Sequence, residues 1–393
     1  MDRKEFLKNS LLATGTIFLP SSVWALDKKL TENSSNGIEN GESEFSYSNP
    51  FVPIFCEGDD YSQAVTKPTI FYKEVVGTKI EIQNMPAYKT QSELGECRAF
   101  SLAAILQQYV NTKWKSDIPD PKNPPSDMAI SHFGLMAYTN QIPNQANTFQ
   151  PNQDVAKGMH EIINEISNSG NRLILEGCKP FDNLYKEFSL KGNKGLEVRD
   201  EFLNYLKGIF KELKNTNELN IKDYSQEVNR LNNYVNLNFN RDTLKKALTK
   251  NNFDQFLYTL FFSDCKMEDF PTGFSAAAFP LDSMNVKYVD IKKQVLKGLK
   301  AEKPVILTAI CISQDKSYDC SLTHSLVITG FKSVEKGSIK KDIFKVHNSW
   351  GVEWQKMNND GWIDADIICQ NTTQVKSKNG TYRFDSGCVV WLD

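Results

Sequence analysis

The chain contains the stretch VHNSWGVEW at residues 346–354. This stretch continues the run IFKV, which is typical of a strand, so Asn348 comes just after a predicted strand. His324 stands 24 residues earlier and opens a second strand-like run, SLVITGF at residues 325–331. An imidazole that acts as a base needs an acceptor on its far nitrogen to orient the ring. The two segments therefore predict a sheet that presents His324 together with Asn348.

A helix is predicted to begin at Cys97, because apolar residues fall at helical spacing over residues 97–110. A thiol attacks as its thiolate, and a helix N-terminus and a neighbouring imidazolium both stabilise that anion. A cysteine on its own is more often a buried structural thiol. Here His324 and Asn348 supply the partners that a catalytic cysteine needs. The backbone N–H of Cys97 and the side-chain amide of Gln91 are candidate donors for an oxyanion.

Three separated segments resemble those of the papain-like cysteine peptidases, in the order that this family uses. They are QSELGECRAFS at residues 91–101, THSLVITGF at 323–331, and the stretch at 346–354 followed by GWI at 361–363. The resemblance implies Cys97 as nucleophile and His324 as its base. It also implies Asn348 as the residue that orients the histidine, Gln91 as an oxyanion donor, and Trp350 as a shield of the His324–Asn348 hydrogen bond. No cofactor is implied.

The resemblance covers roughly residues 80–182 and 285–393, and EGCKPF at 176–181 resembles the family's crossing segment between lobes. It implies an α+β, papain-like two-lobe fold, with a helical lobe first and an antiparallel β-sheet or barrel lobe second. Strand-like runs after Val286 agree with the sheet lobe. Amphipathic, Lys- and Glu-rich periods over residues 183–270 predict an extra helical insertion.

The chain departs from the family pattern in its spacing and beside the nucleophile. The family places about 130 to 150 residues between its cysteine and the later catalytic residues. Here His324 follows Cys97 by 227 residues and Asn348 follows it by 251, a difference mostly explained by the predicted insertion. Arg98 replaces the family's usual tryptophan, and Glu96 places a carboxylate beside the thiol. Such an anion disfavours the thiolate, an effect that Arg98 can offset. The Leu-Gly pair two residues ahead of the nucleophile resembles the bacterial branch of the family.

The first 25 residues have the pattern of an export signal. Arg3, Lys4 and Lys8 precede an apolar run at residues 11–19, and Ala25 fits a small-residue cleavage site. The start RKEFLK also resembles a bacterial twin-arginine signal with its second arginine replaced by lysine. An uncleaved membrane anchor is the alternative, although the run is shorter than the roughly 20 residues of a spanning helix. We therefore expect an exported protein, periplasmic or secreted, with no membrane segment in its mature form.

The domain boundaries follow from these patterns. Residues 1–25 are predicted to be the signal peptide. Residues 26–65 are rich in Ser, Asn, Glu and Gly and too poor in apolar groups to order alone, so they are predicted to form a flexible leader or short pro-segment. Residues 66–393 are predicted to form the peptidase domain, with the helical insertion at 183–270 inside it.

Composition excludes several classes of partner. The 46 Lys and Arg residues against 48 Asp and Glu give a net charge of −2, which argues against nucleic acid as a partner. The chain has eight cysteines but no Cys-x-x-Cys or His-x-x-x-His spacing, which argues against a metal site. Cysteines of exported proteins can be oxidised to disulfides outside the cytosol. We expect such bonds between Cys311 and Cys320 and between Cys369 and Cys388.

The sequence therefore predicts an exported cysteine endopeptidase that hydrolyses polypeptide substrates through a thioester on Cys97. Two alternatives stay open. One is a catalytically weak papain-fold protein that binds polypeptides, and the other is a Cys-dependent acyltransferase or deamidase. The surface of the 183–270 insertion is the expected place for a protein inhibitor or an exosite partner.

Overall fold

The computed structural model describes the chain from residue 73 to its C-terminus, with gaps. The described residues are 73–91, 97–138, 158–168, 172–184, 195–213, 224–251, 253–265, 267–269, 273–280, 287–311, 323–370, 372, 375–376, 382–383 and 388–393. The expected signal peptide at 1–25, the expected leader at 26–65 and Cys320 lie outside these residues.

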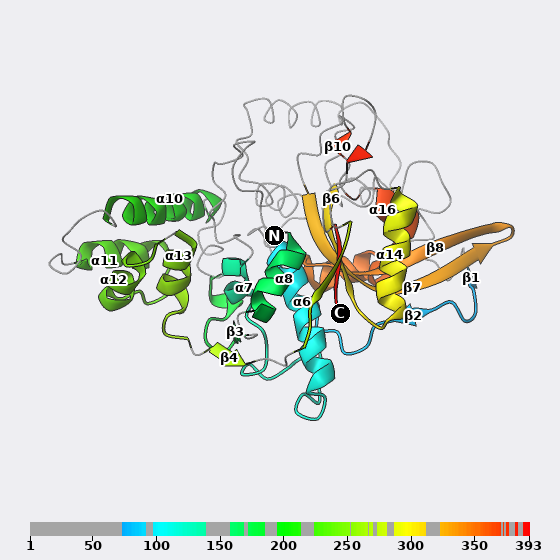
Figure 1. Ribbon diagram of the computed structural model, residues 1–393, viewed down its shortest axis with the longest axis horizontal. Coiled ribbons are helices and arrows are strands. Elements are labelled where there is room, and N and C mark those ends of the chain that lie inside the picture. Colours follow the sequence, from blue (N-terminus) through cyan, green and yellow to red (C-terminus); the bar gives the residue numbers. More distant parts are fainter. Residues whose placement is uncertain are drawn as a thin grey trace, which may run out of the picture.

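An antiparallel sheet is the centre of the fold (Figure 1). Its strands follow the order β5, β12, β6, β7, β8, β9, and β1 and β2 both pair with β7. The bounds are β1 (Lys73–Glu74), β2 (Ile80–Glu81), β5 (Ala276–Phe279), β6 (Val305–Cys311), β7 (Thr323–Lys336), β8 (Ile339–His347), β9 (Trp362–Asp364) and β12 (Val389–Leu392). Two further antiparallel pairs lie outside this sheet, one of them β10 (Val375–Lys376) with β11 (Tyr382–Arg383).

The central strands separate two apolar cores, because side chains alternate between the faces of a strand. Ile306 and Val327 belong to a core shared with the helices of the first half of the chain. Their strand neighbours Leu307 and Leu326 belong to a second core, which is built on the sheet itself. The molecule thus has a helical lobe and a sheet lobe, and the expected α+β fold class is confirmed.

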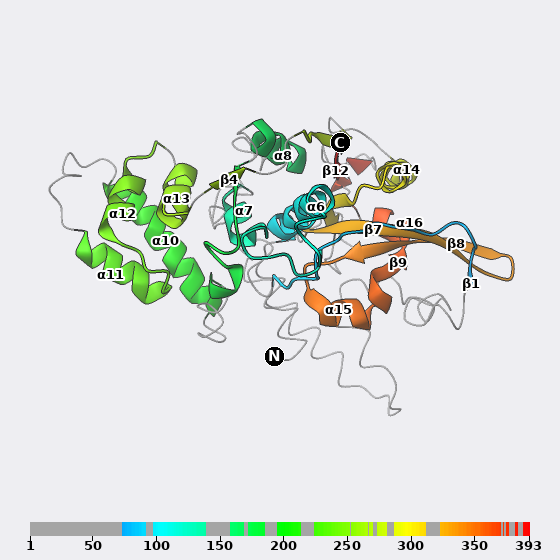
Figure 2. The ribbon, with the colours of Figure 1, turned by 90° about the horizontal axis from the view of Figure 1, so that it is seen from below.

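Helix α6 (Cys97–Lys113) packs against β6 and β7 and joins the two lobes (Figure 2). It is buried along nearly its whole length, from Cys97 to Asn111. The helices α7 (His132–Tyr138) and α8 (Met159–Asn168) complete this part of the helical lobe. The expected helix after Cys97 is therefore confirmed, and its first described residue is the cysteine.

The sheet lobe contains helices that the sequence reading did not include. That reading assigned β character to everything after Val286, but α14 (Tyr288–Lys300) is a helix. Its buried residues Ile291, Val295 and Leu299 are four residues apart and line one face, with lysines on the other. The shorter helices α15 (Gly351–Met357) and α16 (Ala365–Gln370) also lie on this lobe.

The described residues between 195 and 262 form four helices, which lie at the far end of the molecule from the sheet (Figures 1 and 2). They are α10 (Gly195–Leu213), α11 (Ser225–Tyr234), α12 (Arg241–Leu248) and α13 (Phe253–Phe262). Phe133 of α7 contacts Phe261 and Phe262 of α13, with ring centroids 5.3 and 5.0 Å apart. These contacts extend the core of the helical lobe into the four helices.

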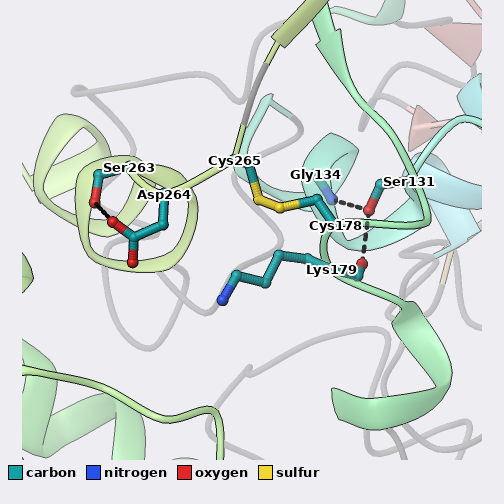
Figure 3. The surroundings of a disulfide bond; sticks show 7 residues. All are labelled: Ser131, Gly134, Cys178, Lys179, Ser263, Asp264 and Cys265. Atoms are coloured by element: carbon teal, nitrogen blue, oxygen red, sulfur yellow. Dashed lines mark hydrogen bonds between the residues drawn. A yellow bond between two sulfur atoms is a disulfide. The ribbon is translucent and has the colours of Figure 1, made fainter. Parts of the chain in front are cut away.

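A disulfide between Cys178 and Cys265 closes the stem of this helical segment (Figure 3). Beside it, β3 (Arg172–Ile174) pairs with β4 (Met267–Asp269). The chain therefore enters and leaves the helical segment through two neighbouring strands. Ser131 ties the same stem to α7, because its Oγ donates to the carbonyl oxygen of Lys179 at 3.0 Å and accepts from the N–H of Gly134.

The expected disulfide between Cys369 and Cys388 is wrong. Both side chains are buried in the core of the sheet lobe, and neither forms a disulfide. The Sγ of Cys388 lies 3.5 Å from the carbonyl oxygen of Phe279. The expected Cys311–Cys320 pair is not described, because Cys320 lies outside the described residues.

Replacing Cys178 and Cys265 with alanine is expected to lower the free energy of unfolding of the helical segment. The disulfide spans 87 residues, and constraining a loop of that size stabilises a fold by about 4.6 kcal/mol in the chain-entropy model. Far-UV circular dichroism during urea unfolding reports the helices, and tryptophan fluorescence reports the sheet lobe, where most tryptophans lie. In the variant, we expect the unfolding transition seen by circular dichroism to move to a lower urea concentration than the transition seen by fluorescence. Wild-type protein under reductant should behave alike, and coincident, unshifted transitions would contradict the prediction.

Candidate active site

The four candidate residues come from both lobes. Cys97 is the first residue of α6, and His324 is the second residue of β7, against which α6 packs. Asn348 comes directly after β8, the strand that pairs with β7. Gln91 lies on the segment that leads toward α6, and its N–H donates to the carbonyl oxygen of Ser349 at 2.7 Å.

The imidazole of His324 is held by Asn348. His324 Nε2 and Asn348 Oδ1 are 2.8 Å apart. Because an amide oxygen can only accept, Nε2 carries the proton and Nδ1 of the neutral ring keeps a lone pair. His324 is 1% exposed and Asn348 is 0% exposed, and His324 Nδ1 is buried without a hydrogen bond to the described residues. The arrangement leaves one basic nitrogen available for a proton from another group.

Trp350 covers this pair. Its ring stacks on the imidazole of His324 with centroids 4.6 Å apart and planes 27° from parallel. Trp354 packs edge-on against Trp350 from α15. The ring of Trp350 therefore covers one face of the His324 imidazole, where the family resemblance implied a shield for the His324–Asn348 hydrogen bond.

Burial decides the charge of the histidine. It lowers the pKa of His324 to about 4, while the hydrogen bond to Asn348 acts in the opposite direction. At neutral pH the imidazole is therefore uncharged in this state. An uncharged imidazole can accept a proton, as a general base must.

The side chain of Gln91 is fixed by a contact that the sequence reading did not include. Ser349 Oγ donates to Gln91 Oε1 at 2.6 Å, and a bridge between Thr90 and Trp350 ties the same two segments together. Since Oε1 is occupied, the amide presents its other end, Nε2, which is buried and has no hydrogen bond to the described residues. A fixed, unsatisfied N–H donor is what an oxyanion requires. Ser349 stands inside the quoted stretch at 346–354, but no pattern distinguished its role from that of its neighbours.

If Cys97 hydrolyses peptides, as the sequence predicts, replacing Ser349 with alanine should lower kcat about tenfold. Loss of an oxyanion donor lowers kcat by roughly 100- to 1,000-fold, and Ser349→Ala removes only the contact that orients the Gln91 amide. In the background of Gln91→Ala, the same change should have no further effect on kcat. Steady-state kinetics of the two single variants and the double variant measure this coupling, and additive losses would contradict it.

Cys97 is 5% exposed, and Arg98 follows it on α6. The guanidinium of Arg98 lies within electrostatic range of Cys97 and of Glu161 on α8. Glu161 accepts a hydrogen bond from the N–H of Gly158 at 2.7 Å, at the start of α8. Glu96, the carboxylate noted in the sequence, lies outside the described residues.

A cavity of about 400 Å³ lies behind Asn348, between the lobes. Cys97 and His324 do not line it. Its wall includes His132, His347 and Glu176, together with exposed lysines at 89 and 122. Burial lowers the pKa of His347 to about 3, and the nearby His132 and Lys345 add to this effect. The sequence reading gave neither histidine a role, and the structure places both on this wall.

Groups of three or more His, Cys, Asp or Glu side chains suited to a metal ion do not occur in the described part of the chain. Among the described helices, none is both long and apolar enough to cross a membrane.

Comparisons with known proteins give similarity only to solved structures. No family model matches the chain, and no curated protein matches it either. One similar structure is a recombinant stem bromelain precursor, at 12% identity and a TM-score of 0.34, covering 97% of this chain and 90% of that one. Another comes from work on antibody cross-reactivity between the mite allergens Blo t 1 and Der p 1, at 11% identity and a TM-score of 0.38, covering 96% and 95%. Similarity at these identities and TM-scores carries no argument for the chemistry of this chain.

Proposed function

We propose that this protein is a papain-like cysteine peptidase that hydrolyses peptide bonds through a thioester on Cys97. The observation that carries the proposal is the hydrogen bond between His324 and Asn348, which leaves His324 Nδ1 buried and without a hydrogen bond to the described residues, on the strand against which α6 packs. Cys97 at the start of that helix is the nucleophile that such a base would serve.

Each step of the reaction has a residue in this arrangement. His324 Nδ1 takes the thiol proton, and the Cys97 sulfur attacks the substrate carbonyl carbon. The resulting oxyanion is held by Gln91 Nε2 and the N–H of Cys97. As the tetrahedral intermediate collapses, the protonated His324 gives its proton to the leaving amine. Water then attacks the thioester with His324 again as base, which releases the carboxylate and restores the thiol.

Asn348 keeps the ring in the required tautomer throughout these steps. With Nε2–H committed to Asn348 Oδ1, only Nδ1 can exchange a proton with sulfur, amine or water. Trp350 preserves this hydrogen bond by keeping water from that side of the ring. The histidine therefore needs no carboxylate partner to act as base and then as acid.

Residues 26–393, as wild type and as Cys97→Ala, test the proposal. Both are incubated with an epoxysuccinyl thiol probe and with casein, and the products are identified by mass spectrometry. We expect the probe on Cys97 and peptide products with new carboxyl termini from the wild type only. Folded, reduced protein without labelling would leave the polypeptide-binding alternative. Labelling accompanied by acyl transfer or deamidation products would favour the transferase or deamidase alternative.

A further inference from the structure

The cavity between the lobes has a wall on which positive charge exceeds negative charge. Lys89 and Lys122 are exposed on it, and Glu176 is the acidic residue among the described residues that line it. Backbone donors already engage both carboxylate oxygens of Glu176. Oε1 accepts from the N–H of Phe181 at 2.9 Å, and Oε2 accepts from the N–H of His132 at 3.3 Å. The described wall therefore suits an anion better than a cation.

His347 brings a buried polar side chain to this wall from the sheet lobe. It is the last residue of β8 and is 8% exposed, and its ring has no hydrogen bond to the described residues. The ring of Tyr88 packs on it with centroids 4.6 Å apart and planes 41° from parallel, a contact that uses neither ring nitrogen. A neutral imidazole carries one N–H donor, and a buried donor without a partner costs free energy. His347 therefore has a donor to offer to a ligand.

His132 brings a second imidazole to the same wall from the helical lobe. It is the first residue of α7, and its Nδ1 lies 3.9 Å from Glu176 Oε2. Phe100 of α6 packs on its ring with centroids 4.4 Å apart. His132 and His347 are within electrostatic range of each other, so each disfavours the charge of the other while the cavity holds no anion. An anion between the two rings would reverse that effect.

The other groups around His347 leave its charge to depend on what the cavity holds. Lys345 on β8 forms ion pairs with Glu81 of β2 and with Asp360, so its charge is already compensated. Burial raises the pKa of Tyr88 above its ordinary value of 10, so this phenol is uncharged. The α6 residues on the wall are uncharged, and β7 pairs with His347 through an apolar residue. Among the described groups, the cavity side is therefore where a counter-charge can reach the ring.

We propose that this cavity binds a small oxyanion, such as sulfate, phosphate or a carboxylate, between His347 of the sheet lobe and His132 of the helical lobe. The exposed Lys89 and Lys122 add positive charge to the same site. A bound anion favours the protonated form of His347, so binding takes up a proton and strengthens as the pH falls. The inference goes beyond the proposed function and does not rest on it, because oxyanion binding needs no reaction at the thiol.

Isothermal titration calorimetry of sulfate into the purified protein at pH 6 and pH 7 tests the proposal, with sodium chloride keeping the ionic strength constant. Binding is measured because sulfate stabilises folded proteins in general, so a gain in stability alone would not identify a site. We expect one saturable site with a Kd on the order of 1 mM. Its Kd should be lower at pH 6 than at pH 7, by up to about tenfold for each proton taken up. His347→Gln should bind about tenfold more weakly and lose most of this pH dependence. His160→Gln on α8, a histidine that does not line the cavity, is the matched control and should bind as wild type.

A second pair of variants keeps the test decisive if His347→Gln does not fold. Lys89→Gln removes a positive charge from the cavity wall and should weaken sulfate binding several-fold. Lys246→Gln on α12 removes the same charge from an exposed position away from the cavity and should bind as wild type.

Titration with acetate distinguishes the two kinds of oxyanion. Tighter binding of sulfate assigns the site to a tetrahedral dianion, and tighter binding of acetate assigns it to a carboxylate. The absence of a saturable site for both anions would overturn the inference. So would a Kd that is the same in wild type and folded His347→Gln, or in Lys89→Gln and Lys246→Gln. Failure of the proposed function has a different result, since sulfate or acetate would still bind while casein stays intact.

Discussion

Replacing His324 with alanine is expected to lower kcat for peptide hydrolysis by roughly 100- to 10,000-fold, the contribution of a positioned general base. His324 Nδ1 is the basic atom presented by the sheet, and it has no hydrogen bond to the described residues. Asn348→Ala should cause a smaller loss, because the ring remains but Nε2 loses the acceptor 2.8 Å away that fixes its tautomer. Steady-state kinetics on a fluorogenic peptide would measure both losses against wild type.

The variant that combines His324→Ala with Asn348→Ala tests the assigned role of Asn348 more sharply than either single change. If Asn348 acts only by orienting His324, then removing it from a chain that already lacks the histidine should leave kcat unchanged. Groups that work as a unit show this non-additivity. Losses that multiply would mean that Asn348 contacts the substrate or supports the fold independently, and would contradict the assigned role. Far-UV circular dichroism of all three variants controls for unfolding.

The elements that carry the candidate site could be predicted because their patterns are local. The helical spacing after Cys97 and the apolar run after His324 each specify one element, and both elements are found as α6 and β7. Helix α14 was missed although its period is present, since Ile291, Val295 and Leu299 are flanked by segments with strand-like character. Periodicity in a short amphipathic helix is a weak signal when neighbouring segments favour strands.

Features that join distant parts of the chain could not be predicted. The partner of Cys178 is 87 residues away, and the choice among eight cysteines depends on how α13 returns to β3 and β4. The contact from Ser349 to Gln91 spans 258 residues and depends on the register of the two segments. The cavity behind Asn348 likewise appears only when the lobes meet.

Acid is expected to destabilise this fold well before its carboxylates titrate. Burial lowers the pKa of His324 to about 4 and that of His347 to about 3, both below the ordinary value of 6.5. As the pH falls below 6.5, the unfolded chain binds protons at these histidines and the folded chain does not. The contribution of the two histidines to stability is therefore complete above pH 6.5. It is lost as the pH falls from 6.5 toward their pKa values in the folded state. Each histidine contributes a slope of about 1.4 kcal/mol per pH unit to the free energy of unfolding.

Urea unfolding at intervals between pH 7 and 5 measures this slope. In this window the carboxyls whose pKa is lowered, such as Glu81, Glu176 and Asp342, stay mostly ionised in both states, because their ordinary values are 4.5 or less. Wild type should lose on the order of 4 kcal/mol over this range from the two histidines together. His347→Gln removes one of them without touching the His324–Asn348 pair, so its slope should be about half that of wild type. An equal slope in the variant would show that His347 takes up its proton in the folded state, which the burial of its ring beside His132 and Lys345 opposes.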